Sequence, residues 1–475
     1  MSAPVRKVVR RVVKKESGAA PRPAATDTPY AGVIDLAPGG IVTDRDNRGL
    51  GDGDVARVGP HLMIAGGTGE GKSRRVLIPN ILRWGRRPVI SLSSKGDVAE
   101  VTIGKRRQYG EVYLLDLSGE VRESELQGVD VTRVKVDPCA LISTDDEALK
   151  MADLLQEISS PGEGDAKFWK NLSRRRLACF LRAGGWYPHP STGEPTWGGG
   201  VAWAVDACED TGGESVPSLD DENVDVSSPN WDSAYLRVLL QGSKHAKSLL
   251  SAKSMDPKQR DSIGMNSQDA LNQWAMSNVA GAASDKAFRP DMLTGGATLY
   301  IVAPMEGAAS AVASLLVKVV DYWRLRVGDL PPILFVLDEF TNGTKLPAQR
   351  VIGWVGEGRG LGIRLVLALQ DSSQLEELWG QAAAKVMRKI VPAFLVMPGA
   401  DEDEALGAAA RMMPVEERVT ANVGADGRVS QGRERMEADA ASLAPVEKGE
   451  ARLLIRGRAG VKVSLPDVAQ TDLLD

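Results

Sequence analysis

The chain has 475 residues, of which 43% are hydrophobic and 25% charged, and its formal net charge is −5. This length predicts two or more domains, and the negative charge argues against a protein that coats nucleic acid over its whole surface, although not against a local basic channel. Three widely spaced cysteines argue against a zinc site or a disulfide framework. Apolar runs of strand length and no evident signal peptide predict a cytoplasmic protein.

Residues 1–30 are basic and differ from the rest of the chain. Seven basic residues stand against Glu16 and Asp27, a local charge of 7 − 2 = +5: Arg6, Lys7, Arg10, Arg11, Lys14, Lys15 and Arg22. Valines at helical spacing would allow an amphipathic segment that binds a membrane surface or a partner. Valine is a poor helix former and prolines follow, so a disordered basic tail is the favoured interpretation.

The first motif with a chemical meaning is Gly66-Gly67-Thr68-Gly69-Glu70-Gly71-Lys72-Ser73, which fits the phosphate-binding pattern of Gly, four residues and Gly-Lys-Ser/Thr. Residues 61–65 are a short apolar run suited to a buried parallel strand, and residues 74–84 carry apolar side chains at helical spacing. A strand, a glycine loop and a helix together direct backbone N–H groups at a phosphate chain. These flanks make a chance glycine-rich turn the less favoured interpretation.

The residue types within this loop predict their roles. Glycine lets the backbone close around an anion without a Cβ atom in the way. We expect Lys72 to reach the β- and γ-phosphates and the Ser73 hydroxyl to help hold Mg²⁺. The motif therefore predicts a nucleoside triphosphate site.

Beyond the loop, residues 87–92 and 112–117 read as further strands that alternate with helices. This order is typical of an α/β protein with a parallel sheet covered on both faces. Between residues 141 and 287 helical periodicity dominates, which predicts an all-α insertion. We expect one helix around residues 168–181, a loop over 184–229, and helices over 234–250 and 262–278.

Strand character returns at residues 299–303, and a helix over 309–326 follows. After about Asp401 we expect a helix, a polar segment and two short strands at 452–455 and 461–463. The predicted division is a basic tail over 1–30, the first part of a P-loop NTPase domain over 31–140, the all-α insertion over 141–290, and the second part of the NTPase domain with the C-terminal strands over 291–475.

An apolar strand over residues 331–337 ends in two acids, Asp338 and Glu339. An acid at the end of a buried strand beside a phosphate loop is placed to bind Mg²⁺, which predicts that role for Asp338. Glu339 is placed to polarise the water that attacks the γ-phosphate. The alternative is an ordinary acidic turn, which the phosphate loop upstream makes less favoured.

Two more residues complete the predicted site. Gln370 ends the strand at residues 363–369 and is placed to sense the γ-phosphate or orient water. Arg359 lies in a glycine-rich turn, from which it would reach a neighbouring subunit's nucleotide as an arginine finger. An exposed surface arginine is an equally weighted interpretation of Arg359.

These motifs, in this order, resemble those of the type IV secretion coupling proteins, the conjugative DNA-transfer ATPases. Four stretches carry the resemblance: Gly66 to Ser73 with Ile78-Pro79-Asn80; Ser94-Lys95-Gly96-Asp97 with Thr102; Leu337-Asp338-Glu339-Phe340; and Gly358-Arg359-Gly360-Leu361-Gly362-Ile363 with Gln370 and Ser373-Gln374-Leu375. It covers most of residues 60–400 and includes Phe168-Trp169 and residues 260–274, where the family has its all-α domain.

The resemblance implies a RecA-like P-loop NTPase domain with an inserted all-α domain, assembled as a hexamer. It implies ATP and Mg²⁺ as cofactors, with Lys72, Glu339, Gln370 and Arg359 in hydrolysis. The implied function is movement of DNA, or of a protein–DNA complex, to a secretion channel, with DNA, a relaxase or channel proteins as partners.

Two departures from the family pattern stand out. The usual N-terminal membrane anchor is not evident, so we expect membrane contact, at the inner face, only through a partner or the basic tail. Many relatives carry Asp-Pro before Lys95, where this chain has Ser93-Ser94, so no role is transferred to Ser93.

Nothing resembles a sequence-reading DNA module, and a translocase needs only phosphate contacts. The all-α region offers two basic clusters, for which solvated helix faces are the favoured alternative: Lys170, Arg174, Arg175 and Arg176; and Lys244, Lys247, Lys253, Lys258 and Arg260. Other functions that fit the motifs are a double-stranded DNA pump of the chromosome-segregation type, which typically lacks the insertion, and an ATP-switched receptor for secreted proteins, against which Glu339 argues mildly.

Overall fold

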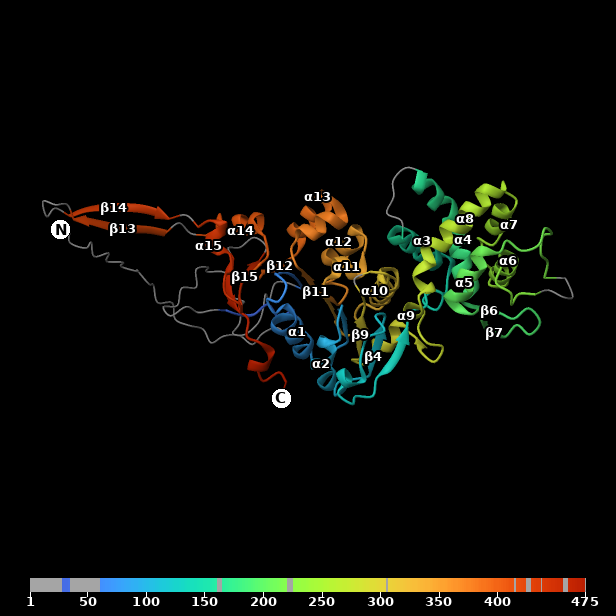
Figure 1. Cartoon of the computed structure of the whole chain (residues 1–475), viewed down its shortest axis with the longest axis horizontal. Helices are drawn as coiled ribbons and strands as arrows, with labels where there is room; N and C mark the ends of the chain where they lie inside the picture. The colour runs from blue at the N-terminus through green and yellow to red at the C-terminus, as the bar shows by residue number, and fades with distance from the viewer. Residues whose placement is uncertain are drawn as a thin grey trace. The chain divides into compact units, whose positions relative to one another are not determined.

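The computed structural model describes residues 28–34, 60–159, 165–219, 225–304, 306–413, 416–423, 429–436, 438–455 and 460–474. The chain divides into two compact units: Met1–Trp84 with Arg364–Asp475, and Gly85–Ile363. Figure 1 shows the elements of the chain, with labels on its helices and on part of its strands. Most of the predicted basic tail, residues 1–27, lies outside the described residues.

The first unit has three parallel strands at its centre: β12 (Ala393–Val396), β2 (His61–Ala65) and β11 (Ile363–Leu369). β2 lies between the other two, and every residue of the three strands is buried. Strands covered on both faces are mainly apolar rather than alternating, and the three strands fit this pattern apart from the buried His61 and Arg364.

An antiparallel edge extends this sheet beyond β12. β15 (Glu450–Ile455) pairs with β12, β16 (Val461–Ser464) pairs with β15, and β1 (Val33–Ile34) pairs with β16. A separate hairpin is formed by β13 (Glu416–Val423) and β14 (Val429–Met436). The helices of the unit are the helical turn Ser73–Leu77 with α1 (Ile78–Arg83), α13 (Ser373–Ile390), α14 (Asp403–Ala410) and α15 (Ala440–Leu443).

The second unit contains a wholly parallel sheet. Its strands, in spatial order, are β10 (Ile333–Leu337), β3 (Val89–Ser93), β9 (Thr298–Val302), β4 (Val112–Asp116), β5 (Thr132–Lys135) and β8 (Lys286–Ala287). The helices that belong with this sheet are α2 (Asp97–Arg107), α10 (Ala309–Arg324), α11 (Phe340–Thr344) and α12 (Ala348–Glu357).

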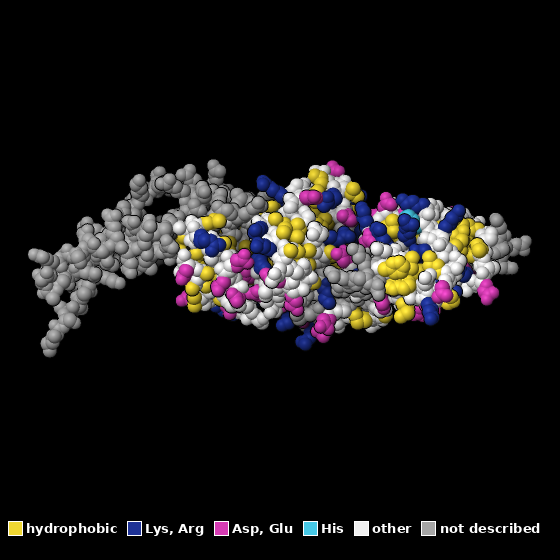
Figure 2. All heavy atoms as spheres, turned by 90° about the horizontal axis from the view of Figure 1, so that it is seen from above, with side chains coloured by type: hydrophobic (Ala, Val, Ile, Leu, Met, Phe, Trp, Pro, Cys, Tyr) yellow, Lys and Arg dark blue, Asp and Glu magenta, His cyan; other side chains and the backbone are white. Residues whose placement is uncertain are grey.

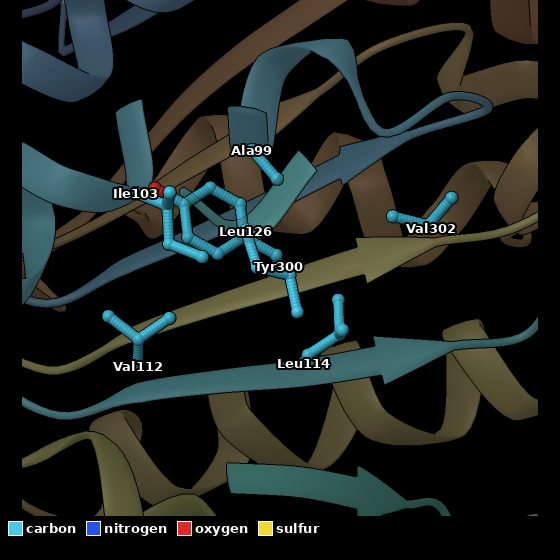
Figure 3. Packing of buried hydrophobic residues seen from close by; sticks show 7 residues of the cluster. All are labelled: Ala99, Ile103, Val112, Leu114, Leu126, Tyr300 and Val302. Atoms are coloured by element: carbon cyan, nitrogen blue, oxygen red, sulfur yellow. The ribbon is translucent and has the colours of Figure 1, made fainter. Parts of the chain in front are cut away.

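Helix α2 covers β4 and β9 through a buried apolar cluster, seen in Figure 3. Ala99 and Ile103 of the helix pack against side chains of the two strands, and Leu126 closes the cluster. The Thr102 and Tyr300 hydroxyls share a 2.6 Å hydrogen bond within it, so both buried hydroxyls are satisfied. This packing fixes one face of the parallel sheet.

The helical part of the second unit is built around α4 (Asp165–Gly184), which contacts α3, α5, α6 and α8. Its other elements are α3 (Asp145–Ser159), the hairpin β6 (Trp186–Pro188) and β7 (Pro195–Trp197), α5 (Gly200–Glu209), α6 (Trp231–Leu240), α7 (Lys247–Lys253), α8 (Pro257–Leu271) and α9 (Ser277–Ala280). The predicted α/β fold with an all-α insertion is confirmed, whereas the predicted domain bounds stay a prediction.

Two sequence-based expectations for this region are wrong. The expected loop over 184–229 contains the β6–β7 hairpin and helix α5, whose buried Val201, Ala204 and Cys208 recur at helical spacing among the glycines and prolines. The single helix expected over 234–250 is two helices. Gly242 adopts a left-handed φ of 69° just after α6, a conformation that ends a helix and favours glycine.

Among the described residues, no helix is both long and apolar enough to cross a bilayer.

Candidate nucleotide site

The predicted phosphate loop connects β2 to the helical segment that begins at Ser73. Gly69 and Gly71 have φ values of 83° and 88°, in the left-handed region that residues with a Cβ atom rarely adopt. The loop can therefore curl between strand and helix only because glycine stands at these positions. This is the expected arrangement of strand, loop and helix.

The Lys72 side chain folds back over its own loop. Its Nζ atom donates to the carbonyl oxygens of Gly66 at 2.6 Å and Gly67 at 3.3 Å. The ammonium is half-buried, so its charge lies within the curl of the backbone rather than in bulk water. Hydrogen bonds from an ammonium to an anionic oxygen are stronger than those to a neutral carbonyl, so a phosphate is a suitable acceptor for Lys72.

The residues that follow β11 and β12, the two neighbours of β2, contact the phosphate loop. The Gly66 amide donates to the carbonyls of Leu369 (3.3 Å) and Gln370 (3.1 Å), at the end of β11. The Gly67 amide donates to the carbonyl of Pro398, after β12, at 2.9 Å. The structure therefore brings Gln370 to the start of the phosphate loop, although the two are some 300 positions apart in sequence.

A buried acid, which sequence reasoning missed, joins these two flanking segments. Glu402 is 4% exposed and accepts hydrogen bonds from the Ser372 amide (2.7 Å) and hydroxyl (2.8 Å). Burial raises the pKa of Glu402 to about 7, with a further increase from the charge of Asp371, while the Ser372 hydrogen bonds act in the opposite direction. No local motif marks this residue.

The C-terminal segment also contacts the phosphate loop. Lys448 Nζ donates to the Gly69 carbonyl at 2.7 Å. Just after the loop, Arg74 makes a two-pronged ion pair with Asp467, at 2.7 and 2.9 Å, and Arg75 donates to the Leu465 carbonyl. This segment had no predicted function, and its partners lie too far away in sequence for a local pattern to reveal them.

In the second unit, Asp338 and Glu339 follow β10, as expected, and both are half-buried. The Asp338 amide donates to the Leu92 carbonyl of β3 at 3.0 Å, which continues the parallel ladder to the acid. Glu339 has φ 45° and ψ 44°, a left-handed conformation. A non-glycine residue in this region carries strain of about 1–3 kcal/mol, and such residues cluster at functional sites.

Arg359 is exposed in the turn between α12 and β11. The Ile363 amide donates to the Gly358 carbonyl at 2.8 Å and closes that turn, so the arginine projects from a short, well-defined loop. This position fits both the arginine finger and the surface arginine. The role of Arg359 stays a prediction.

Several members of the predicted basic clusters have structural partners. Arg176 is buried and donates to the Ser248 and Leu172 carbonyls, at 3.1 and 2.6 Å, and Arg174 pairs with Asp153. Lys253 pairs with Asp232, and Lys244 with Asp146.

Three other members of these clusters are exposed: Arg175, Lys247 and Lys258. On the face seen in Figure 2, basic and acidic side chains of the described residues are interspersed.

With the geometry established, comparison with known proteins identifies the family. A model of type IV secretory system conjugative DNA transfer proteins matches residues 31–405. The chain belongs to this conjugative DNA transfer family. The match spans the phosphate loop, Asp338, Glu339 and Gln370, and it confirms the resemblance inferred from the four motifs.

Solved structures of the bacterial conjugative coupling protein TrwB have the same fold as this family member. The structure of TrwB in complex with sulphate is 17% identical, with a TM-score of 0.58 over 97% of this chain and 95% of that one. The structure with ADP and Mg²⁺ is 19% identical, with a TM-score of 0.56 over 98% and 96%. Comparison with curated protein sequences gave no match.

Proposed function

We propose that this chain is an ATP-hydrolysing motor that drives DNA toward a conjugative type IV secretion channel. The observation that carries the proposal is the phosphate loop, with Lys72 folded into it, in a member of the conjugative DNA transfer family. P-loop ATPases cradle the β- and γ-phosphates of the nucleotide with the backbone of such a strand–loop–helix turn and with its lysine.

ATP and Mg²⁺ are the proposed cofactors. TrwB has been solved with a non-hydrolysable ATP analogue and with ADP and Mg²⁺. In this chain Lys72 would exchange its bonds to the Gly66 and Gly67 carbonyls for the β- and γ-phosphates. Ser73 and Asp338 would hold the Mg²⁺, which neutralises charge on the phosphates when bound. The loop glycines would donate backbone N–H groups to the phosphate chain.

Hydrolysis needs three further roles. Glu339 would polarise the attacking water, because a carboxylate is a suitable acceptor for its proton. Gln370, whose carbonyl accepts from the Gly66 amide, would orient that water or sense the γ-phosphate. Arg359, exposed in its turn, would act on the nucleotide of a neighbouring subunit in a hexamer, where it would stabilise the charge that develops in the transition state.

For DNA, the proposed contact is with backbone phosphates. The exposed Arg175, Lys247 and Lys258 are the candidates that the helical region retains. A sixfold repeat would multiply such modest charge around a pore, and the resulting grip would weaken with salt. A relaxase or channel proteins would be the protein partners. Membrane contact would come through such a partner or the basic tail over residues 1–30.

The test is ATP hydrolysis over a protein concentration series, without DNA, with single-stranded DNA and with duplex. Lys72→Ala is the blank, and Arg175→Ala tests the DNA contact. A rate that rises more than linearly with protein concentration, and that DNA stimulates, supports a ring-shaped DNA motor. Hydrolysis that is indifferent to both forms of DNA contradicts the motor and favours an ATP-switched receptor. In that case Glu339→Gln would keep its binding to the secreted protein.

A further inference from the structure

The phosphate loop is flanked by two segments that follow neighbouring strands. β2 lies between β11 and β12, so the residues after all three strands emerge at one edge of the sheet. The segment after β11 holds Gln370 and Ser372, and the segment after β12 holds Glu402. Each segment accepts a hydrogen bond from one of the first two loop glycines.

Side chains tie these two flanking segments to each other. Ser372 donates to both oxygens of Glu402, from its amide at 2.7 Å and from its hydroxyl at 2.8 Å. A second link runs in parallel, because the Asp401 amide donates to Asp371 Oδ2 at 2.8 Å. The Ser372–Glu402 and Asp371–Asp401 hydrogen bonds therefore connect the two segments that contact the phosphate loop.

Glu402 accepts two of the hydrogen bonds that connect the segments, and it is buried. Ser372 and Glu402 are 3% and 4% exposed, so water competes little for their hydrogen bonds. A buried carboxylate that keeps two donors is a strong constraint, because removing it leaves both donors unsatisfied. Asp371 also accepts from the Ser373 amide at 2.7 Å, which ties the same segment to the start of α13.

Gln370 lies within the constrained segment. Its amide donates to the Gln374 side chain at 3.0 Å, and its carbonyl accepts from Gly66. Two residues further on, Ser372 is held by Glu402. The backbone of Gln370 is therefore fixed on one side by the phosphate loop and on the other by the Ser372–Glu402 link.

We propose that Glu402 is a positioning residue for ATP hydrolysis, which acts through Ser372 to hold Gln370 at the phosphate loop. The proposal rests on the proposed function, since it requires that the loop binds ATP and that Gln370 takes part in hydrolysis. Glu402 itself touches no substrate in this scheme. It acts on the geometry of the transition state, whereas Lys72 and the loop amides act on nucleotide binding.

If Glu402 acts on the transition state and not on nucleotide binding, its loss should lower kcat and leave nucleotide affinity almost unchanged. Glu402→Ala frees the Gln370 segment but leaves the glycines and Lys72 in place, so kcat falls by about 10- to 100-fold, the range for a displaced catalytic group. KM and the dissociation constant for a fluorescent ATP analogue change by less than about 3-fold, because an interaction made only in the transition state affects kcat. Ser372→Ala, which removes one of the two hydrogen bonds, gives an intermediate loss of kcat.

A double-mutant cycle tests whether Glu402 acts through Gln370. The full-length wild-type protein, Gln370→Ala, Glu402→Ala and the double variant are assayed for hydrolysis under identical conditions, with Glu404→Ala, an exposed acid two residues along, as the matched control. Positioning predicts that Glu402→Ala costs little further activity in the Gln370→Ala background. If Glu402→Ala does not fold, the cycle is run with Ser372→Ala.

Each other outcome is decisive. Losses that multiply in the double variant overturn the positioning role and leave the proposed function intact. A nucleotide affinity that falls as much as kcat, together with a lower melting temperature, also overturns it, because the link is then a general structural support. A wild-type protein that shows no hydrolysis above the Lys72→Ala blank overturns both the positioning role and the proposed ATPase.

Discussion

Asp137 caps a helix that begins more than 60 positions later in the chain. The Val201 amide, at the start of α5, donates to both carboxylate oxygens, at 3.1 and 3.2 Å, and the nearer Cys139 amide donates at 2.9 Å. The residues immediately before α5 are glycines, which offer no side chain to accept from the first amides. A distant acid therefore takes the role that Ser or Asp usually has at the N-cap.

We expect Asp137→Ala to lower the free energy of unfolding by about 1–3 kcal/mol, because it removes the cap and leaves buried amides unsatisfied. Urea unfolding followed by tryptophan fluorescence measures the change. Asp206→Ala, which removes an exposed acid from the same helix, is the control. Equal effects of the two variants would contradict the capping role.

The C-terminal segment should affect nucleotide binding through Lys448. Its ammonium holds the Gly69 carbonyl, so Lys448→Ala loosens the tip of the phosphate loop. We expect the dissociation constant for an ATP analogue to rise by about 2- to 10-fold, the factor that corresponds to one lost hydrogen bond. Lys462→Ala, in the same segment but paired with Glu450, should bind normally. An unchanged affinity in Lys448→Ala would show that the loop keeps its shape without this contact.

The all-α region should depend on the buried guanidinium of Arg237. Its central carbon lies over the ring of Trp203, 3.8 Å from the ring centroid, and over the ring of Tyr187, 4.6 Å from the centroid. The guanidinium also donates to the carbonyls of Val226 at 2.7 Å and Gly198 at 2.6 Å. Lysine keeps the charge but loses the planar fork and the stacking.

We expect Arg237→Lys to lower the free energy of unfolding by about 2–3 kcal/mol through lost hydrogen bonds and cation–π contacts. Thermal unfolding monitored by circular dichroism checks this prediction. The control is Arg175→Lys, the same substitution at an exposed position on α4, which should leave the melting temperature unchanged. A comparable shift in that control would mean that any arginine-to-lysine change is harmful here.

His61 should make the protein sensitive to acid. Its side chain is fully buried in β2, and burial, with a smaller effect of the nearby Arg364 charge, lowers its pKa to about 3. In the unfolded chain histidine has a pKa of about 6.5. The unfolded state thus binds one more proton between these two values, and the stability that neutral His61 contributes above pH 6.5 is lost as the pH falls toward 3.

We expect the free energy of unfolding of the wild-type protein to fall more steeply between pH 6 and pH 4 than that of His61→Leu. The difference in slope approaches about 1.4 kcal/mol per pH unit, the value for one proton. Urea midpoints across this window measure it. The substitution removes the titration of His61 itself, so identical slopes would show that His61 is not held neutral in the folded state.

Features that contiguous residues specify are predictable from the sequence, whereas features that depend on distant partners are not. The strands predicted at residues 61–65 and 363–369 are confirmed, because both are short, mainly apolar runs of the length typical of a strand covered on both faces. Helix α5 was missed, because glycine- and proline-rich flanks hid its periodicity and its cap is Asp137. Several basic side chains that were only candidate DNA contacts, with solvated helix faces the favoured alternative, are buried or paired with acids: Arg176, Arg174, Lys244 and Lys253. Charge spacing alone does not reveal this.

What the sequence determined by itself is the phosphate loop with its strand and helix, the acids that end β10 and the family, since contiguous residues specify each of them. Only the tertiary structure decided that Glu402 holds Ser372, 30 positions away, and that Lys448 holds Gly69, 379 positions away. The reason is physical. The carboxyl ends of the parallel strands β2, β11 and β12 meet at one edge of the sheet, and the start of β15, which is antiparallel to β12, lies at the same edge. Hydrogen bonds between these segments follow from the pairing of the strands rather than from any local pattern.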